Sequence, residues 1–142
     1  MPAGYSGTPL LKKLGVKDGA KGLLVAVPDT ICELVEFDLW GTIKTAKTER
    51  GISGGPYDYL HYFTADDAKF LTALPALKKT MAQNAMIWVS WPKKASKVPS
   101  TVTEPLVRKT ALSIGLVDIK VCAIDEVWSG LKLVIPVKDR TS

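Results

Sequence analysis

An apolar run in the second half of the chain constrains the fold more than any other feature. From Ala85 to Trp91 every residue except Ser90 is apolar, and Pro92 ends the run. A strand that is apolar on both faces belongs in the centre of a sheet covered on both sides. Helices must provide that cover, so the run predicts a three-layer, Rossmann-like α/β fold.

Segments that predict strands alternate with segments that predict helices over most of the chain. Strands separated by helices pair in parallel through right-handed crossovers, so most of the sheet should be parallel. The last two strands follow one another directly, and we expect them to form a hairpin around a turn at 125–130. The predicted elements are a helix at 8–14, a strand at 22–27, a helix at 30–37, a weak strand at 42–47, an aromatic strand at 57–63, a helix from Thr64 that Pro75 breaks or restarts, a strand at 85–91, a helix from 101–104 to Gly115, and strands at 117–124 and 131–135.

The length of the chain fits a single domain. Its 142 residues divide into a helical lead-in at 1–21, a sheet core at 22–136 and a tail at 137–142. Hydrophobic residues make up 46% and charged residues 23%, which argues against disorder and fibrous repeats. No apolar run approaches the roughly 20 residues of a membrane helix. The first residues also lack the pattern of a secretory signal, so we expect a cytoplasmic protein without a membrane partner.

Apolar spacing also predicts which side chains are buried. Ile31, Leu34 and Val35 recur at helical spacing and should face the core together. Cys32 and Cys122, the only two cysteines, each lie inside an apolar element, which is typical of buried free thiols. In a cytoplasmic protein these thiols should not form a disulfide.

Familiar catalytic and metal-binding patterns are missing. Two cysteines and one histidine cannot supply the usual four ligands of a structural zinc site, so no metal is predicted. A serine triad would depend on His61, which lies in the aromatic strand. The glycines of 51–55 are followed by Pro56, where a phosphate-binding loop needs lysine. The candidate nucleophiles for such a triad, Ser90, Ser96 and Ser129, therefore remain unsupported, and no catalytic residue is assigned.

Three strings of the sequence are long and unusual: GYSGTPL at 4–10, WVSWPKKAS at 88–96 and KVCAIDEVWSGL at 120–131. They closely resemble a bacterial family described as a domain of unknown function with a methyltransferase-like fold. The helix and strand expected at 74–79 and 86–89, together with the closing hairpin, resemble the class I S-adenosylmethionine-dependent methyltransferases. The resemblance implies a truncated, mostly parallel sheet of about six strands, where the full fold has seven.

The same resemblance allows a test of cofactor binding. A methyltransferase of this class needs a glycine-rich turn after its first strand, because the backbone passes close to the cofactor. Here that turn would be Val27 to Thr30, which contains no glycine. A carboxylate after the second strand normally holds the ribose, and Glu49 is the only candidate. No cofactor is therefore predicted, with S-adenosylmethionine as the alternative.

The expected topology nevertheless indicates where a ligand would bind. In open α/β sheets ligands bind beyond the carboxyl ends of the strands, so residues that follow different strands should gather on one rim. Indoles near lysines suit a flat, anionic ligand such as a nucleotide; the competing interpretation is that both indoles only cap the core. The predicted ligand-binding residues are Pro28, Asp29, Thr64, Trp91, Lys93, Lys94, Asp125, Trp128 and Ser129.

Three hypotheses for the function remain open. The first is a non-catalytic binding module for an anionic or nucleotide-like ligand, which the net charge of +5 favours without identifying a partner. The second is a divergent methyltransferase, and the third is a protein-protein interaction or assembly domain. Nucleic acid is a weaker candidate partner, because lysines clustered at 12–21 and 93–97 are also typical of an ordinary solvated surface.

Overall fold

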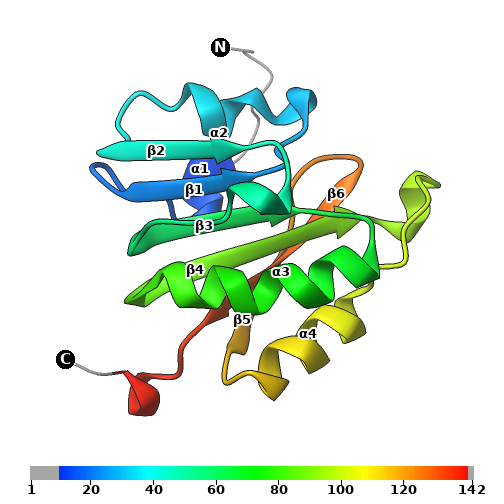
Figure 1. The fold of residues 1–142 in the computed structure, drawn as a ribbon. Helices are drawn as coiled ribbons and strands as arrows, with labels where there is room; N and C mark the ends of the chain where they lie inside the picture. Colours follow the sequence, from blue (N-terminus) through cyan, green and yellow to red (C-terminus); the bar gives the residue numbers. More distant parts are fainter. Residues whose placement is uncertain (1–9, 141–142) are drawn as a thin grey trace.

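The computed structural model, which describes residues 10–140, contains one six-stranded sheet with helices on both faces (Figure 1). The strand order is β2-β1-β3-β4-β6-β5, and all neighbours from β2 to β4 are parallel. β6 lies antiparallel between β4 and β5. The strands are β1 Lys21–Val25, β2 Thr42–Ala46, β3 Tyr57–Phe63, β4 Met81–Pro92, β5 Val117–Ala123 and β6 Trp128–Val134. The predicted three-layer α/β fold, mostly parallel and closed by a hairpin, is confirmed.

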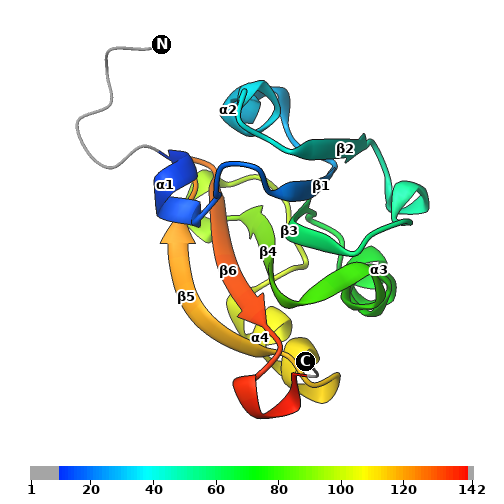
Figure 2. The ribbon, with the colours of Figure 1, turned by 90° about the vertical axis from the view of Figure 1, so that its left-hand side faces the viewer.

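Two pairs of helices cover the sheet (Figure 2). One face carries α1 and α2, and the other carries α3 and α4, as the two separate hydrophobic clusters also show. None of the helices among residues 10–140 is long and apolar enough to cross a membrane. Their bounds are α1 Leu10–Leu14, α2 Cys32–Glu36, α3 Asp67–Thr80 and α4 Glu104–Ser113.

β4 supplies side chains to both cores. Val89 and Trp91 belong to the cluster under α3 and α4, whereas the fully buried Trp88 belongs to the cluster under α1 and α2. The indole Nε1 of Trp88 also donates a hydrogen bond of 2.9 Å to the carbonyl oxygen of Leu14 at the end of α1. The apolar run therefore occupies the centre of the molecule, as the sequence predicts.

α3 differs from the prediction because it continues through Pro75. Proline leaves the carbonyl four residues earlier without its helical partner, which usually breaks or kinks a helix. Here that carbonyl belongs to Leu71, an exposed residue that water can reach. Leu74 and Leu77 on the two sides of Pro75 are fully buried. Their packing against the sheet keeps the helix in one piece.

The segment around α2 corrects two burial predictions. A short 3-10 turn at Asp29–Ile31 comes first, and α2 then starts at Cys32. This turn changes the helical frame, so Ile31 and Leu34 are buried while Val35 is 48% exposed. Cys32 is exposed as well, whereas Cys122 is buried, and both thiols are free. The prediction of two buried cysteines therefore fails for Cys32.

Two strands are longer than predicted, and one predicted feature lies outside the described residues. β4 starts at Met81 because that residue pairs with Tyr57. β6 starts at Trp128 because that residue pairs with Pro92. The start of the predicted first helix at Thr8 and Pro9, and most of the string at 4–10, precede the described residues.

Gly130 in β6 makes room for the side chains of β4. A Cβ at this position would lie 2.9 Å from Ser90 Oγ and 3.1 Å from the Trp88 ring. We predict that Gly130→Ala lowers the free energy of unfolding by about 2 kcal/mol, because neither buried neighbour can move away. Denaturant unfolding measures this change. Ser129→Ala, on the half-buried neighbour, should change stability by less than about 0.5 kcal/mol, and an equal loss in both variants would contradict the account.

Candidate functional site

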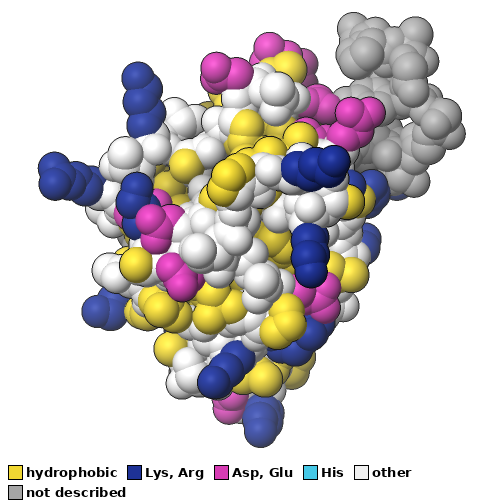
Figure 3. Space-filling view, turned by 90° about the vertical axis from the view of Figure 1, so that its right-hand side faces the viewer, with side chains coloured by type: hydrophobic (Ala, Val, Ile, Leu, Met, Phe, Trp, Pro, Cys, Tyr) yellow, Lys and Arg dark blue, Asp and Glu magenta, His cyan; other side chains and the backbone are white. Residues whose placement is uncertain are grey.

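The carboxyl ends of β1 to β4 meet at one edge of the sheet, which Figure 3 shows from outside. Basic side chains stand around this edge, with hydrophobic side chains exposed between them. Two grooves open here. Each exceeds the lower limit of roughly 300 Å³ that is typical of small-molecule pockets.

The first, which we name the β1–β2 groove, has a volume of about 440 Å³. It lies where β1 and β2 end, beside α2. Its apolar walls include Val27, Val35 and Ala46, and its charged groups are the exposed Asp29 and Lys47. Val35, which the sequence placed in the core, is therefore part of a groove wall. The complete lining is Leu24, Ala26, Val27, Asp29, Val35, Thr45, Ala46 and Lys47.

A left-handed residue forms the turn at the floor of this groove. Ala26 directly follows β1 and has a φ of 59°, and its N–H donates a hydrogen bond of 2.8 Å to the carbonyl oxygen of Ala46. Residues with a Cβ avoid this conformation, which costs them about 1–2 kcal/mol. The glycine-rich turn expected at Val27 to Thr30 is therefore replaced by a left-handed turn one residue earlier, at Ala26. An alanine gives no sequence signal for a positive φ.

Glu49, the sequence candidate for holding a ribose, has another partner. The Tyr62 hydroxyl donates a hydrogen bond of 2.6 Å to Glu49 Oε2, and Glu49 does not line the β1–β2 groove. Burial and the hydrogen bond to this carboxylate both raise the pKa of Tyr62. The phenol therefore stays protonated and keeps its role as donor. Asp29 is the carboxylate that does line the groove.

The second, which we name the β4–α4 groove, has a volume of about 450 Å³. It lies between the end of β4, the loop after it and the start of α4. Trp91, Pro92, Val98 and Val102 form its apolar part. Its polar lining residues are Lys94, Lys97, Ser100, Thr103 and Glu104.

The structure separates the two indoles that the sequence analysis placed on one rim. Trp91 packs in the core under α3 and α4, while Trp128 packs against the opposite core and meets the Phe63 ring edge-on at 5.4 Å. The two side chains point to opposite faces because Trp128 pairs with Pro92 rather than with Trp91. A single ligand therefore does not stack between them.

The other predicted residues divide into groove residues and residues with structural contacts. Asp29 lines one groove, and Trp91 and Lys94 line the other. Asp125 Oδ1 accepts hydrogen bonds of 2.8 and 2.7 Å from the N–H groups of Val127 and Trp128, which closes the hairpin turn.

The remaining four predicted residues are held mainly through their backbones. The N–H of Thr64 donates to the carbonyl oxygen of Ser90 at 3.0 Å, and Thr64 itself is buried. The N–H of Lys93 donates to the carbonyl oxygen of Val127 at 2.7 Å, and the Pro28 carbonyl oxygen accepts from Ile31 at 2.9 Å. Ser129 pairs with Trp91 across the β4–β6 ladder. These contacts fix the backbone of the four residues, and none of the four lines either groove.

His61 lies in a buried polar chain and lines neither groove. Its Nδ1 is hydrogen bonded to the Tyr59 hydroxyl at 2.8 Å and its Nε2 to Ser90 Oγ at 2.7 Å. The ring stacks on Phe63 at 4.2 Å. All three chain members are almost completely buried, and burial lowers the pKa of His61 to about 3. A neutral, enclosed imidazole cannot act as a base on a ligand from solvent, so the chain is structural.

Metal-binding groups do not cluster in the part of the chain that the structure describes. Among residues 10–140, no three histidine, cysteine, aspartate or glutamate side chains come together in a way that could hold a metal ion. The groups that could bind a ligand in the two grooves are therefore carboxylates, lysines and apolar side chains.

Several solved structures with a similar arrangement of strands and helices are methyltransferases. No family model and no curated protein matches the sequence. Similar solved structures include ribosomal protein L11 methylase from Lactobacillus delbrueckii subsp. bulgaricus, with a TM-score of 0.61 and 12% identity over 89% of this chain and 74% of that one. The N-methyltransferase NodS from Bradyrhizobium japonicum WM9 has a TM-score of 0.60 and 14% identity over 89% of this chain and 92% of its own. The chain has the fold of the S-adenosylmethionine-dependent methyltransferases.

One of the similar solved structures is described with bound SAH. Magnesium protoporphyrin IX methyltransferase ChlM from Synechocystis PCC 6803, solved with bound SAH, has a TM-score of 0.57 and 12% identity over 87% of this chain and 78% of that one. At these identities the likeness concerns the fold. Within residues 10–140 the sheet has six strands, with β2 at one edge.

We predict that His61 makes the stability of the protein sensitive to acid. Its folded pKa of about 3 lies below the unfolded value of 6.5, so the unfolded chain binds the proton first as the pH falls. The histidine contribution to stability is therefore present above the unfolded pKa of 6.5 and is lost as the pH falls toward the folded pKa, by about 2.5 kcal/mol between pH 7 and pH 4.5. Denaturant unfolding at both pH values measures the loss.

His61 is the only histidine, so His61→Asn should abolish the part of this stability loss that comes from protonation of the imidazole. The part that comes from protonation of carboxylates should remain. The imidazole proton signals in NMR spectra offer a check that needs no variant. They should keep their neutral positions down to about pH 4.5. A midpoint near the normal value of 6.5 would contradict the prediction.

The left-handed turn at Ala26 gives a second prediction. Ala26→Gly should leave the free energy of unfolding within about 1 kcal/mol of wild type, because relief of strain offsets the greater freedom of the unfolded chain. Ala26→Val should lower it by about 2 kcal/mol, because a β-branched side chain tolerates a positive φ poorly. Denaturant unfolding of the two variants tests this. Equal stability of the glycine and valine variants would show that the turn is not left-handed.

Proposed function

We propose that this protein is a divergent S-adenosylmethionine-dependent methyltransferase whose cofactor binds in the β1–β2 groove. The observation that carries the proposal is the position of this groove. It opens at the carboxyl ends of β1 and β2, beside a left-handed turn directly after β1, in a sheet that matches those of methyltransferases. ChlM, which shares the fold, is described with bound SAH and also with bound SAM.

The lining of the groove suits an adenosine-containing molecule. Val27, Val35 and Ala46 offer apolar surface for a flat base. Asp29 offers a carboxylate that can accept hydrogen bonds from hydroxyl or ammonium groups and attract a positively charged centre. When bound, the cofactor would supply an electrophilic methyl group on a sulfonium. Asp29 and the apolar walls would bind and orient it, and Ala26 would keep the backbone clear of it.

Two departures from the family pattern predict weak binding. The turn carries the Cβ of Ala26 where a glycine would leave more room. Glu49, in the sequence region of the usual ribose carboxylate, is held by Tyr62. Asp29, which follows β1 and not β2, would have to bind the ribose hydroxyls in place of Glu49. We therefore expect dissociation constants in the micromolar range and not in the nanomolar range.

A second candidate is a protein that binds such a ligand without transferring a group. This candidate is favoured because neither groove is lined by a histidine that could act as a base. The only histidine of the chain, His61, is fully buried in the sheet. Acceptors that are already nucleophilic need no base, so this observation does not decide between the candidates. Methyl transfer from labelled S-adenosylmethionine to an acceptor would establish the enzyme.

Calorimetry with S-adenosylmethionine and S-adenosylhomocysteine tests cofactor binding directly. Asp29→Asn should weaken binding by about tenfold, because it removes one charge-assisted contact. Val35→Arg should weaken it at least as much by filling the groove, and the exposure of Val35 makes this change compatible with folding. Asp38→Asn, on an exposed carboxylate outside the groove, is the matched control and should leave binding unchanged. Absence of binding at about 1 mM would contradict the proposal.

A further inference from the structure

We propose that the β4–α4 groove is a second binding site, which takes a small organic anion with an apolar body and a phosphate or carboxylate group. No residue lines both this groove and the β1–β2 groove, so this inference does not depend on cofactor binding. Three features of the groove carry it: an apolar wall continuous with the core, two lysines without acidic partners, and a carboxylate held by an arginine.

The apolar wall is built on Trp91, whose side chain is only 6% exposed and packs into the core under α3 and α4. Val102, also buried, adjoins it in the lining, and Val98 is 42% exposed at the groove. A volume of about 450 Å³ is enough for one aromatic or short aliphatic group with its polar substituent. The wall therefore favours a ligand with an apolar part over a bare inorganic ion.

Two lysines at the groove provide the positive charge. Lys94 and Lys97 are both exposed, and neither forms an ion pair within residues 10–140. A tight turn keeps the two residues together: the Lys97 N–H donates a hydrogen bond of 3.2 Å to the carbonyl oxygen of Lys94, and Lys97 has a φ of 63°. Two ammonium groups on one turn can approach the same anionic group.

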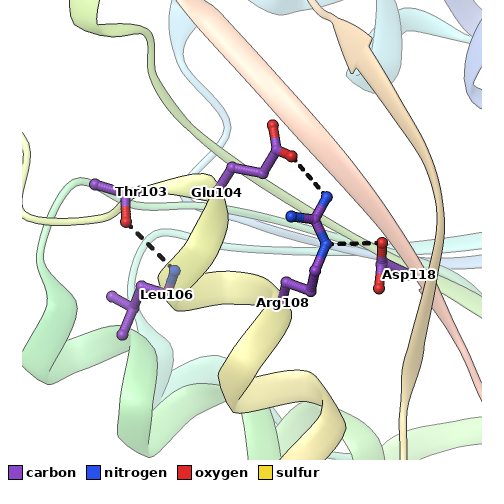
Figure 4. A network of polar contacts seen from close by, with 5 residues as sticks. All are labelled: Thr103, Glu104, Leu106, Arg108 and Asp118. Carbon is purple, nitrogen blue, oxygen red and sulfur yellow. Dashed lines mark hydrogen bonds and ion pairs between the residues drawn. The ribbon is translucent and has the colours of Figure 1, made fainter.

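The carboxylate in the groove lining is paired with an arginine and forms no ion pair with these lysines. Glu104 Oε2 accepts a hydrogen bond of 2.6 Å from Arg108 Nη2, one helical turn along α4 (Figure 4). The same guanidinium binds Asp118 on β5 through Nε at 3.0 Å. Arg108 is therefore the ion-pair partner of both carboxylates, and these three groups together carry a net charge of −1. Lys94 and Lys97 carry +2 and have no ion-pair partner within residues 10–140, so the groove keeps a positive balance for an anionic ligand.

The two hydroxyl groups of the lining are already used to shape it. Thr103 Oγ1 accepts a hydrogen bond of 3.3 Å from the Leu106 N–H and caps α4 (Figure 4). Ser100 Oγ accepts from the Val102 N–H at 3.1 Å. Ser100 Oγ also donates to the carbonyl oxygen of Val102 at 3.0 Å, so of these two hydroxyls the Thr103 O–H is left as a donor. We therefore expect the lysines and the apolar wall to provide most of the selectivity, with a smaller part from hydroxyl contacts.

NMR titration of the full chain with phenyl phosphate, benzoate and benzyl alcohol tests the proposal, because the three probes share a ring and differ in charge. The indole signal of Trp91 and the backbone signals of Lys94 and Lys97 should move. Phenyl phosphate should bind most tightly, benzoate more weakly, and benzyl alcohol should not saturate at about 10 mM. If the site is selective for phosphate, phenyl phosphate should have a much lower dissociation constant than benzoate. If it accepts any small organic anion, the two dissociation constants should be similar.

The double variant Lys94→Ala/Lys97→Ala should weaken phenyl phosphate binding by about tenfold or more. The matched control Lys109→Ala/Lys138→Ala changes two exposed lysines outside the groove and should stay within about twofold of wild type. Equal binding of benzyl alcohol and phenyl phosphate, an unmoved Trp91 signal, or an equal loss in both variants would each overturn the proposal. S-adenosylhomocysteine binding in the double variant separates this outcome from failure of the cofactor site.

Discussion

Burial of β4 on both of its faces is the constraint on which the rest of the structure depends. Trp88 lies on one face and fixes α1 through its indole N–H, while Val89 and Trp91 lie on the other face under α3 and α4. Neither face can be exposed to water, so helices have to cover both. Loops that could form a site are then confined to the ends of the strands, where backbone groups can still reach solvent or one another.

At the carboxyl ends, many polar groups bind one another and only a few are left for ligands. Asp125 closes the hairpin, Thr103 caps α4, Glu49 accepts from Tyr62, and Arg108 holds Glu104. In the two grooves this leaves Asp29 and Lys47 beside β1 and β2, and Lys94 and Lys97 beside β4. The two grooves therefore differ in charge: one combines a carboxylate with a lysine, and the other presents two lysines. This difference is the basis for assigning them different ligands.

The sequence predicted the sheet well, because apolar runs and alternation report burial directly. The aromatic strand at 57–63 matches β3 residue for residue, and the closing hairpin is confirmed. The site was predicted less well, because it depends on details that residue types do not reveal. The pairing of Trp128 with Pro92 decides which face each indole occupies, and a 3-10 turn before α2 moves Val35 into a groove wall. The positive φ of Ala26 follows from its bond to Ala46, far along the chain.

A crystal structure of the protein grown with S-adenosylhomocysteine would test the central claim most directly, namely that the methyltransferase fold here retains a cofactor groove at β1 and β2. The account predicts the nucleoside between Val27, Val35 and Ala46, with a polar group of the ligand within hydrogen-bonding distance of the Asp29 carboxylate. The ligand bound elsewhere, or an empty groove at saturating concentration, would contradict the account.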